Sequence, residues 1–500
     1  MLKDWRIYSA KNSKKNMRIR KNTYIDQKIT IENIKKEFEN SSDIRFKQIQ
    51  LDEGMFTLVF IEGMVLTDIV DNDILKPIVY ADKVPKIENN KNLDIFSMLE
   101  NGLIPHVSSS VVITLDKVIS SILNGEICLI DSKINNKAIA FDTRKVNSRS
   151  LSEPTTENIV KGSKEAFIEA IRTNITLIRT RLKTTDLKID EVLVGNDVKT
   201  RIAIIYMDSV VDKEMLDKVT NKIKAIDTNK LVAPADFEEQ IIDNKYTIFP
   251  QLIYTEKTDK AVSNIMEGKI VAVIDGLPIV YILPAVLPMF FQAPEDYSTN
   301  YFIASLIRII RYCCAFLSLV LPAFYVSITT FHQEMIPVDL AISIIQSKEG
   351  EPFPAVIEVI FMLLAFEILI EASVRLPKTI GQTISIIGGL IVGQAAVSAK
   401  FVSPAVVVTI AIAGLTGFLI PNQDFSNSIR LCRFLIVIFS AIAGLYGLSL
   451  GLIFVVYSMS TIESFGVPYF TPLASNDAIN IEKDTLIRAP MLDMRKDKNK

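Results

Sequence analysis

The chain has 500 residues, four cysteines and two histidines, and its formal net charge is −2. It carries no Cys- or His-rich metal motif and no disulfide framework, so we expect no metal site, no cofactor and no enzymatic activity. The mean hydropathy is nevertheless +0.30, because long apolar runs follow Ile270 while the charged residues gather before it. This asymmetry predicts an α+β soluble N-terminal half followed by an α-helical polytopic membrane domain.

Residues 1–28 form a basic arm. The arm lacks the apolar core of a secretory signal, so we expect the soluble half to lie in the cytoplasm. A disordered, solvated arm is the simpler interpretation. The alternative is electrostatic attachment to anionic lipid headgroups, at about 1 kcal/mol per basic residue.

The first soluble lobe is expected over residues 29–155. A short amphipathic helix is predicted near residues 29–40, and two alternating strands follow around a turn at Asp52 to Gly54. A helix is predicted over residues 65–78, and later a second helix that ends near Gly125, with two more strands after it.

The second lobe is expected over residues 156–295. Residues Ser163–Lys183 predict a strong helix, and residues 187–195 and 200–208 predict paired strands. Residues 211–226 predict a further helix. No G-x-x-x-x-G-K-[ST] phosphate loop occurs, so we do not expect nucleotide hydrolysis, and nothing predicts a nucleic-acid partner.

Two stretches of the soluble half match each other, ITLDKVISSILNGEICLID and EKTDKAVSNIMEGKIVAVID. Asp116, Lys117, Gly125 and Ile127 align with Asp259, Lys260, Gly268 and Ile270, each pair 143 residues apart. This offset predicts an internal duplication that makes two tandem, related lobes. Chance similarity between α/β segments is the alternative.

The membrane domain is expected over residues 296–465, with four to six crossings and five as the best estimate. A crossing needs about 20 apolar residues, and backbone polar groups in lipid must be paired within the segment, which requires helices. The first helix is predicted near Tyr301–Ile328. Arg308 and Arg311 lie near its start, where they could reach cytoplasmic headgroups.

The second candidate helix, Ala355–Arg375, carries charge. A carboxylate at the position of Glu367 costs about 2.5–3 kcal/mol, which the surrounding apolar residues offset. Glu367, Glu371 and Arg375 recur at four-residue spacing on one face. Glu367 and Glu371 are therefore candidate carboxylates of a pore or a subunit interface, and a solvated interfacial helix is the alternative.

The third helix is predicted near residues 379–399. Gln382, Ser385, Gly389 and Gly393 share one narrow face, which predicts close helix packing or a narrow aqueous path. Two further apolar runs, 402–420 and 430–460, complete the domain. In the last run a stripe of small residues predicts packing: Ser440, Gly444, Gly447, Gly451 and Ser458.

The charges of the loops indicate on which side of the membrane each loop and the C-terminus lie. Five crossings with basic loops inside would place the C-terminus outside. The polar C-terminal tail, 466–500, is however basic at its end, and an interfacial second helix would return it to the inside. Both arrangements stay open.

Several long stretches carry a family resemblance: VIDGLPIVYILPAVLPMFFQAPEDYS, LPAFYVSITTFHQEMIPVDL, FEILIEASVRLPKTIGQTISIIGGLIVGQAAV and SFGVPYFTPLA. Through them, over most of residues 108–475, the chain resembles the A subunits of the GerA-type spore germinant receptors of endospore-forming bacteria. The first hundred residues and the tail match weakly.

The resemblance implies a location in the spore inner membrane, with a transporter-like B subunit and a lipoprotein C subunit as partners. It also implies a homo-oligomer, a pentamer, that forms a cation channel opened by germinant and releases monovalent cations. The family offers no assigned catalytic residues to transfer. A non-conducting scaffold and a secondary transporter are the alternatives; internal repeats within the membrane half, expected of many transporters, are not found in this sequence.

Overall fold

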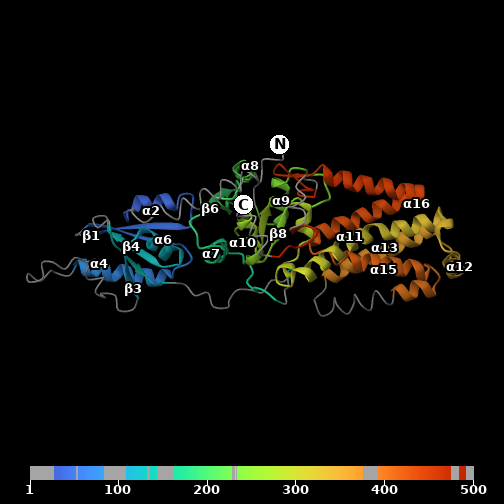
Figure 1. The fold of residues 1–500 in the computed structure, drawn as a ribbon, viewed down its shortest axis with the longest axis horizontal. Helices are drawn as coiled ribbons and strands as arrows, with labels where there is room; N and C mark the ends of the chain where they lie inside the picture. Colours follow the sequence, from blue (N-terminus) through green and yellow to red (C-terminus); the bar gives the residue numbers. More distant parts are fainter. Residues whose placement is uncertain are drawn as a thin grey trace, which may run out of the picture. The chain divides into compact units, whose positions relative to one another are not determined.

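The computed structural model describes residues 28–51, 54–83, 108–131, 136–143, 157, 161–227, 231, 233–375, 392–473 and 484–490 (Figure 1). Contacts divide the chain into two compact units. Unit 1 contains Met1–Ile242, Leu252–Pro284 and Met491–Lys500, and unit 2 contains Asp243–Gln251 and Ala285–Pro490. The first is an α/β unit and the second is helical.

Unit 1 holds two five-stranded antiparallel sheets. The first has the order β1-β2-β4-β5-β3, with β1 (Ile44–Leu51), β2 (Gly54–Ile61), β3 (Ser109–Val112), β4 (Ile127–Asp131) and β5 (Ala138–Phe141). The second has the order β6-β7-β9-β10-β8, with β6 (Leu187–Val194), β7 (Thr200–Met207), β8 (Ile253–Thr255), β9 (Ile270–Ile274) and β10 (Val280–Leu283). The predicted hairpin at Asp52 to Gly54 is confirmed by the pairing of β1 with β2.

The two sheets have the same strand order, as the duplication predicts. The starts of β1 and β6, residues 44 and 187, are 143 apart, and so are the starts of β4 and β9, residues 127 and 270. The helices α6 (Leu115–Leu123) and α10 (Thr258–Met266) keep the same offset. Each is followed by a glycine in the left-handed region, Gly125 (φ 86) and Gly268 (φ 91), where a side chain would be strained.

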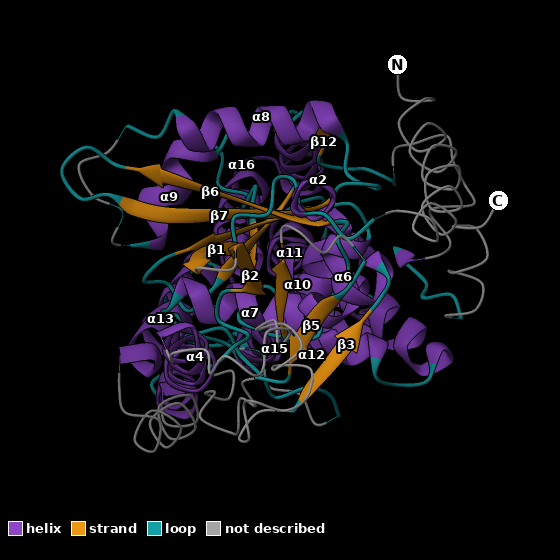
Figure 2. Ribbon diagram, turned by 90° about the vertical axis from the view of Figure 1, so that its left-hand side faces the viewer, coloured by secondary structure: helices purple, strands orange, loops and turns teal. Residues whose placement is uncertain are grey.

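Polar side chains cap the starts of two of the remaining helices of unit 1, α2 (Ile31–Glu37) and α8 (Lys213–Lys224). Thr30 accepts a hydrogen bond from the backbone N–H of Asn33 at the start of α2, and Asp212 caps α8. The others are α3 (Thr67–Ile69), the π-helix η1 (Val70–Leu75), α4 (Lys76–Lys83), α7 (Ile171–Arg181) and α9 (Pro234–Ile241). In the second sheet α8 packs along β6 (Figure 2).

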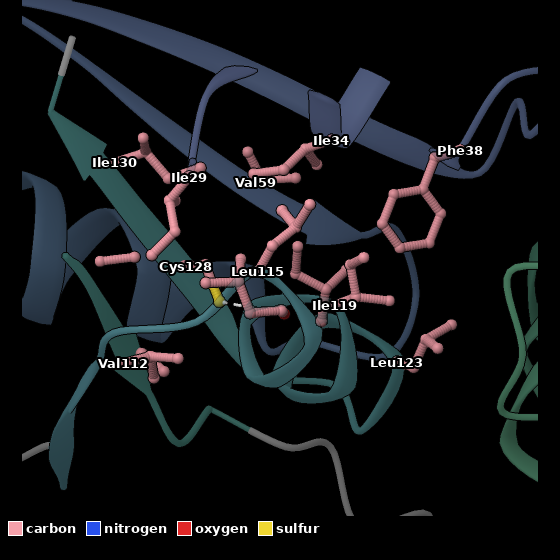
Figure 3. Close-up of a cluster of buried hydrophobic side chains, with 14 of the residues drawn as sticks. Ile29, Ile34, Phe38, Val59, Val112, Leu115, Ile119, Leu123, Cys128 and Ile130 are labelled. Atoms are coloured by element: carbon pink, nitrogen blue, oxygen red, sulfur yellow. Dashed lines mark hydrogen bonds between the residues drawn. The ribbon is translucent and has the colours of Figure 1, made fainter. Parts of the chain in front are cut away.

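The core of the first lobe lies between its sheet and the helices α2 and α6. Leu115 and Ile119 of α6 point towards Val59 and Cys128 of the sheet, and Ile34 of α2 closes the cluster (Figure 3). Burying each such side chain stabilises the fold by about 1.5–3 kcal/mol. Burial also raises the pKa of the Cys128 thiol, so this cysteine packs as a small apolar side chain.

The predicted helix Ser163–Lys183 is wrong in its first eight residues, because α7 begins only at Ile171. The preceding segment is extended: Ala166 forms a bridge with Lys257, and the backbone N–H of Phe167 donates to the carbonyl of Glu256 at 2.8 Å. The Asn174 side chain then binds both backbone groups of Ile168. These pairings replace the first helical turns.

A buried ion pair connects the two lobes within unit 1. The Arg179 guanidinium on α7 binds Asp43 through two hydrogen bonds of 2.9 Å, and both side chains are at most 1% exposed. A parallel bridge between Ser41 and Ile189 lies beside it. The lobes therefore form one unit despite their separate sheets.

The described part of unit 2 consists mainly of helices with short connecting elements. The helices are α11 (Tyr301–Thr330), α12 (Val338–Ser347), α13 (Ala355–Arg375), α15 (Pro404–Gly417) and α16 (Gln423–Ser460), and residues 392–398 are also helical. The short elements are the 3-10 helices η2 (Leu287–Phe291), η3 (Pro294–Tyr297) and η4 (Gln333–Met335) and the strands β11 (Glu463–Ser464) and β12 (Val467–Pro468). Within the described residues, α11 and α16 have the length and apolar composition that a membrane span requires.

The helix α16 is broken in its middle, where the sequence predicted one continuous run over residues 430–460. Ala443 (φ −133, ψ 18) and Gly444 (φ 58, ψ −137) are not helical. A Cβ on Gly451 would lie 3.4 Å from the Cα of Ile436, whereas a straight helix would separate these residues by about 22 Å. The arms 423–442 and 445–460 therefore form an antiparallel hairpin (Figure 1).

The side-chain contacts give the direction of each helix in unit 2. The first arm of α16 runs parallel to α11, since Arg433 meets Ser318 and Ser440 meets Ser327. α13 and α15 run parallel to each other, since Glu358 meets Ser403 near their starts and Phe366, in the middle of α13, meets Phe418 just after α15. α11 runs antiparallel to α15, since Ser318 meets the carbonyl of Ala413 and Tyr325 lies beside Ser403.

These contacts define two ends of unit 2. The first end holds the start of α11 and the ends of α13 and α15. The second end holds the end of α11, the starts of α13 and α15, and the turn of α16, where Gly444 lies against Phe331. Lys400, whose ammonium donates to the carbonyl of Glu349 at 3.3 Å, also lies at the second end. Arg375, the last residue of α13, therefore lies at the first end, whereas Lys400 lies at the second.

Candidate functional site in the charged groups of the helical unit

Five charged side chains form a closed cluster at the start of α11, which we call the Asp296 cluster: Asp296, Arg308, Arg311, Asp484 and Arg488. Arg311 donates to both oxygens of Asp296 at 2.8 Å, and Arg308 donates to Asp296 at 3.2 Å and to Asp484 at 2.9 Å. Arg488 donates to the backbone carbonyls of Asp296 and Thr299. The cluster ties residues 484–490 to the first turns of α11.

The expectation that Arg308 and Arg311 extend to lipid headgroups is wrong. Arg308 is fully buried and Arg311 is 9% exposed. Their partner Asp296 lies only 12 and 15 positions before them in the chain, on the turn that precedes α11. The two guanidinium groups are therefore neutralised by the Asp296 carboxylate and not by lipid headgroups.

The predicted carboxylates of α13 are both paired. Glu367 binds Arg430 of α16 through two hydrogen bonds, one of them 3.1 Å from Arg430 Nε. Glu371 binds Arg375 at 2.6 Å, the i,i+4 pair that the spacing predicts, and both side chains are mostly exposed. Glu367 thus lies between two helices, whereas Glu371 lies on the outer face of α13.

A second arginine of α16, Arg433, is buried without a carboxylate partner in the part of the chain that the structure describes. Its Nη2 donates to Ser318 Oγ at 2.5 Å and to the carbonyl of Ala413 at 3.3 Å. Its Nε and Nη1 have no hydrogen-bond partner there. Burying an arginine without a bound carboxylate costs free energy, and in membrane proteins such a residue is a candidate functional position.

Glu358 of α13 is a buried carboxylate that the sequence did not single out. It is fully enclosed, and it accepts hydrogen bonds from the backbone N–H of Ser403 at 2.9 Å, from Ser403 Oγ at 3.0 Å and from Lys348 at 3.3 Å. Burial, with the nearby Glu358 carboxylate, also raises the pKa of Glu351 in the preceding loop. The available signal was a lone carboxylate in the apolar run AVIEVIF.

Most of the predicted small-polar stripe lies outside the described residues: Gln382, Ser385 and Gly389. Gly393 is described and lies in the helical segment 392–398, where an added Cβ would meet Val407 of α15 at 3.6 Å. The pore interpretation of this stripe stays a prediction. Across the described ranges, no group of three or more His, Cys, Asp or Glu side chains is placed to hold a metal ion.

Comparison with known proteins identifies the family. A family model described as Bacillus/Clostridium GerA spore germination protein matches residues 32–500. Spore germination protein KA of Bacillus subtilis (strain 168) is 36% identical over 459 residues, which cover 91% of this chain and 83% of that protein. Spore germination protein B1 of the same organism is 30% identical over 473 residues, or 94% of this chain and 96% of that protein.

A solved structure also matches, the crystal structure of the N-terminal domain of the A subunit of the Bacillus megaterium spore germinant receptor GerK3. It covers 53% of this chain and 99% of that chain, with 22% identity and a TM-score of 0.41. The family model and the sequence relatives assign the family without this structure. The chain belongs to the GerA family of spore germination proteins.

Proposed function

We propose that this chain is the membrane subunit of a spore germinant receptor and that several copies form a ligand-gated cation channel. Family membership supports the receptor role. The observation that carries the membrane assignment is the apolar outer surface of unit 2, since soluble proteins rarely expose large contiguous apolar patches. Exposed side chains on its helices include Phe302, Ile303, Phe361, Ile368, Ile442, Tyr446, Ile453 and Tyr457.

The helix directions in unit 2 favour six crossings. These are α11, α13, the third helix predicted near residues 379–399, α15, and the two arms of α16. An even number places the C-terminal tail on the same side as the start of α11. With a cytoplasmic unit 1, the tail is then cytoplasmic too, which suits its basic end.

The six-crossing arrangement predicts opposite labelling of two introduced cysteines in a cysteine-free background. In intact cells that express the chain, a membrane-impermeant maleimide is expected to label Gln346→Cys in α12 and not Lys500→Cys. Permeabilisation is expected to expose Lys500→Cys. Lys199→Cys in unit 1 provides the inside control, and labelling of Lys500→Cys in sealed cells would support five crossings.

The partners that we propose are a transporter-like B subunit and a lipoprotein C subunit, in the spore inner membrane. The name of the GerK3 relative describes it as the A subunit of a receptor, which fits a multi-subunit assembly. The homo-oligomer is proposed as a pentamer, from family resemblance. Glu367, Glu371 and the stripe of Gln382, Ser385, Gly389 and Gly393 are the candidate pore or interface residues.

The channel can be tested with the purified chain in liposomes, alone and with its partner subunits. Loaded potassium is expected to leave wild-type liposomes, and Ser385→Leu is expected to reduce the rate at least tenfold while the oligomer persists. A bulky apolar side chain would fill a narrow path that a serine leaves open.

Two controls separate the alternatives. Ser449→Leu changes an exposed serine of α16 and is expected to leave the rate unchanged. Loss of the oligomer in Ser385→Leu would instead support a packing role for the stripe. Absence of flux from wild type with all partners present would favour the non-conducting scaffold.

A further inference from the structure

Arg433 occupies an unusual position in unit 2. It is 1% exposed, and Ser318 of α11 and the backbone of α15 supply its hydrogen bonds, so no charge of opposite sign is bound to it in the described residues. Two of its donor nitrogens remain unpaired there. An unpaired buried charge is strongly destabilising, because desolvation is not offset by attraction.

Glu367 and Arg430 are the charged groups that act electrostatically on Arg433. Arg430 and Arg433 are three positions apart, so their side chains are neighbours on the surface of the first arm of α16. Arg430 meets Glu367 of α13, whereas Arg433 meets α11 and α15. The Glu367 carboxylate therefore lies beside two arginines and binds only the more exposed one.

The two arginines differ in what they lose without Glu367. The Arg430 side chain is 18% exposed, and its Nη1 also binds Asn427 Oδ1 at 3.1 Å. It would keep a partner and partial solvation if the carboxylate moved away. Arg433 has no solvation and only neutral partners, Ser318 Oγ and the carbonyl of Ala413, so a carboxylate would supply the charge of opposite sign that it lacks.

We propose that Glu367 exchanges between Arg430 and the buried Arg433, which makes a two-position ion pair between α13 and α16. In the inner position the carboxylate satisfies the unpaired nitrogens of Arg433, and Arg430 turns to Asn427. The exchange would shift α13 relative to the α16 hairpin. A part in gating rests on the proposed channel, whereas the exchange itself does not.

A hydrophobic carbodiimide tests the exchange without ligand or conduction. The reagent modifies protonated carboxyl groups, and an unpaired carboxylate in apolar surroundings takes up a proton. The full-length protein in detergent is treated with dicyclohexylcarbodiimide, and modification of Glu367 is quantified by mass spectrometry. The comparison uses wild type, Arg430→Gln, Arg433→Gln and the double variant.

If the exchange occurs, the modification of Glu367 in Arg430→Gln stays within about twofold of the wild-type level, because Arg433 then binds the carboxylate. Only the double variant is expected to show modification raised tenfold or more. If Arg430→Gln alone is modified as strongly as the double variant, Arg433 does not bind Glu367 and the proposal is overturned.

Two carboxylates of the same helix provide internal controls. Glu358 is fully buried and is expected to stay unmodified while α13 remains packed, and Glu371, exposed and paired with Arg375, is expected to keep its wild-type level of modification in every variant. If Glu358 is modified in Arg430→Gln, the test passes to Arg430→Met, which fills a similar space without a charge. In that background Arg433→Gln is then expected to raise Glu367 modification tenfold or more, and no increase would overturn the proposal.

Discussion

Replacing Asp296 with alanine is expected to destabilise the protein by about 3–5 kcal/mol, the cost of removing one partner from a buried ion pair. Arg311 would lose its carboxylate, and Arg308 would keep only Asp484. The repulsion among Arg308, Arg311 and Arg488 would then be compensated by Asp484 alone in a buried site. We expect a large fall in the temperature at which the detergent-solubilised protein unfolds, and little protein in the membrane fraction.

The neighbouring residue provides the control. Glu295→Gln changes a carboxylate in the same 3-10 helix, whose described hydrogen bonds use only its backbone carbonyl. It is expected to behave like wild type. A wild-type unfolding temperature for Asp296→Ala would mean that the arginines find other partners, and that the cluster does not stabilise α11.

Replacing Gly447 with leucine is expected to open the α16 hairpin. A Cβ at this position would lie 1.9 Å from the backbone carbonyl oxygen of Phe439, so even the first added carbon requires the two arms to separate. Overpacking of a closed contact typically costs about 1–3 kcal/mol, and here the obstacle is backbone that cannot rotate away. We expect loss of the assembled receptor, measured as the amount of oligomer recovered from membranes.

Leu450→Ala is the matched control, because Leu450 lies on the same arm and is exposed. It removes apolar surface without touching the other arm, and wild-type recovery is expected. If Gly447→Leu is also recovered normally, the two arms do not pack through this glycine in the assembled protein.

The α/β unit was largely predictable, because its pattern is local and appears twice. The alignment of Gly125 with Gly268 gave the offset of 143 residues that relates β1 to β6 and β4 to β9, and the other three strand pairs start 142 to 146 residues apart. The start of α7 was not predictable, since residues 163–170 have good helix propensity but pair instead with the segment around Lys257. Tertiary pairing overrides propensity at such edges.

The helical unit was predicted less completely. The turn of α16 was not predicted, because apolar residues continue through it. Gly444 also did not stand out, since other glycines lie three and seven positions further on. Glu367 was found from its charge in an apolar run, but its partner Arg430 lies 63 positions away. Arg433 was not identified from the sequence, because its burial without a bound carboxylate depends on the packing of α11, α15 and α16 in the folded unit.

The Asp296 cluster also has a consequence for the order of synthesis. Arg308 emerges early in unit 2, yet Asp484 follows it by 176 residues, after every helix of the unit has been made. Throughout that interval the first helix holds its arginines with one carboxylate instead of two. The ion pair between Arg308 and Asp484 can therefore form only after every described helix of the unit has been made, and a chain truncated before Asp484 would contain those helices but lack this pairing of α11.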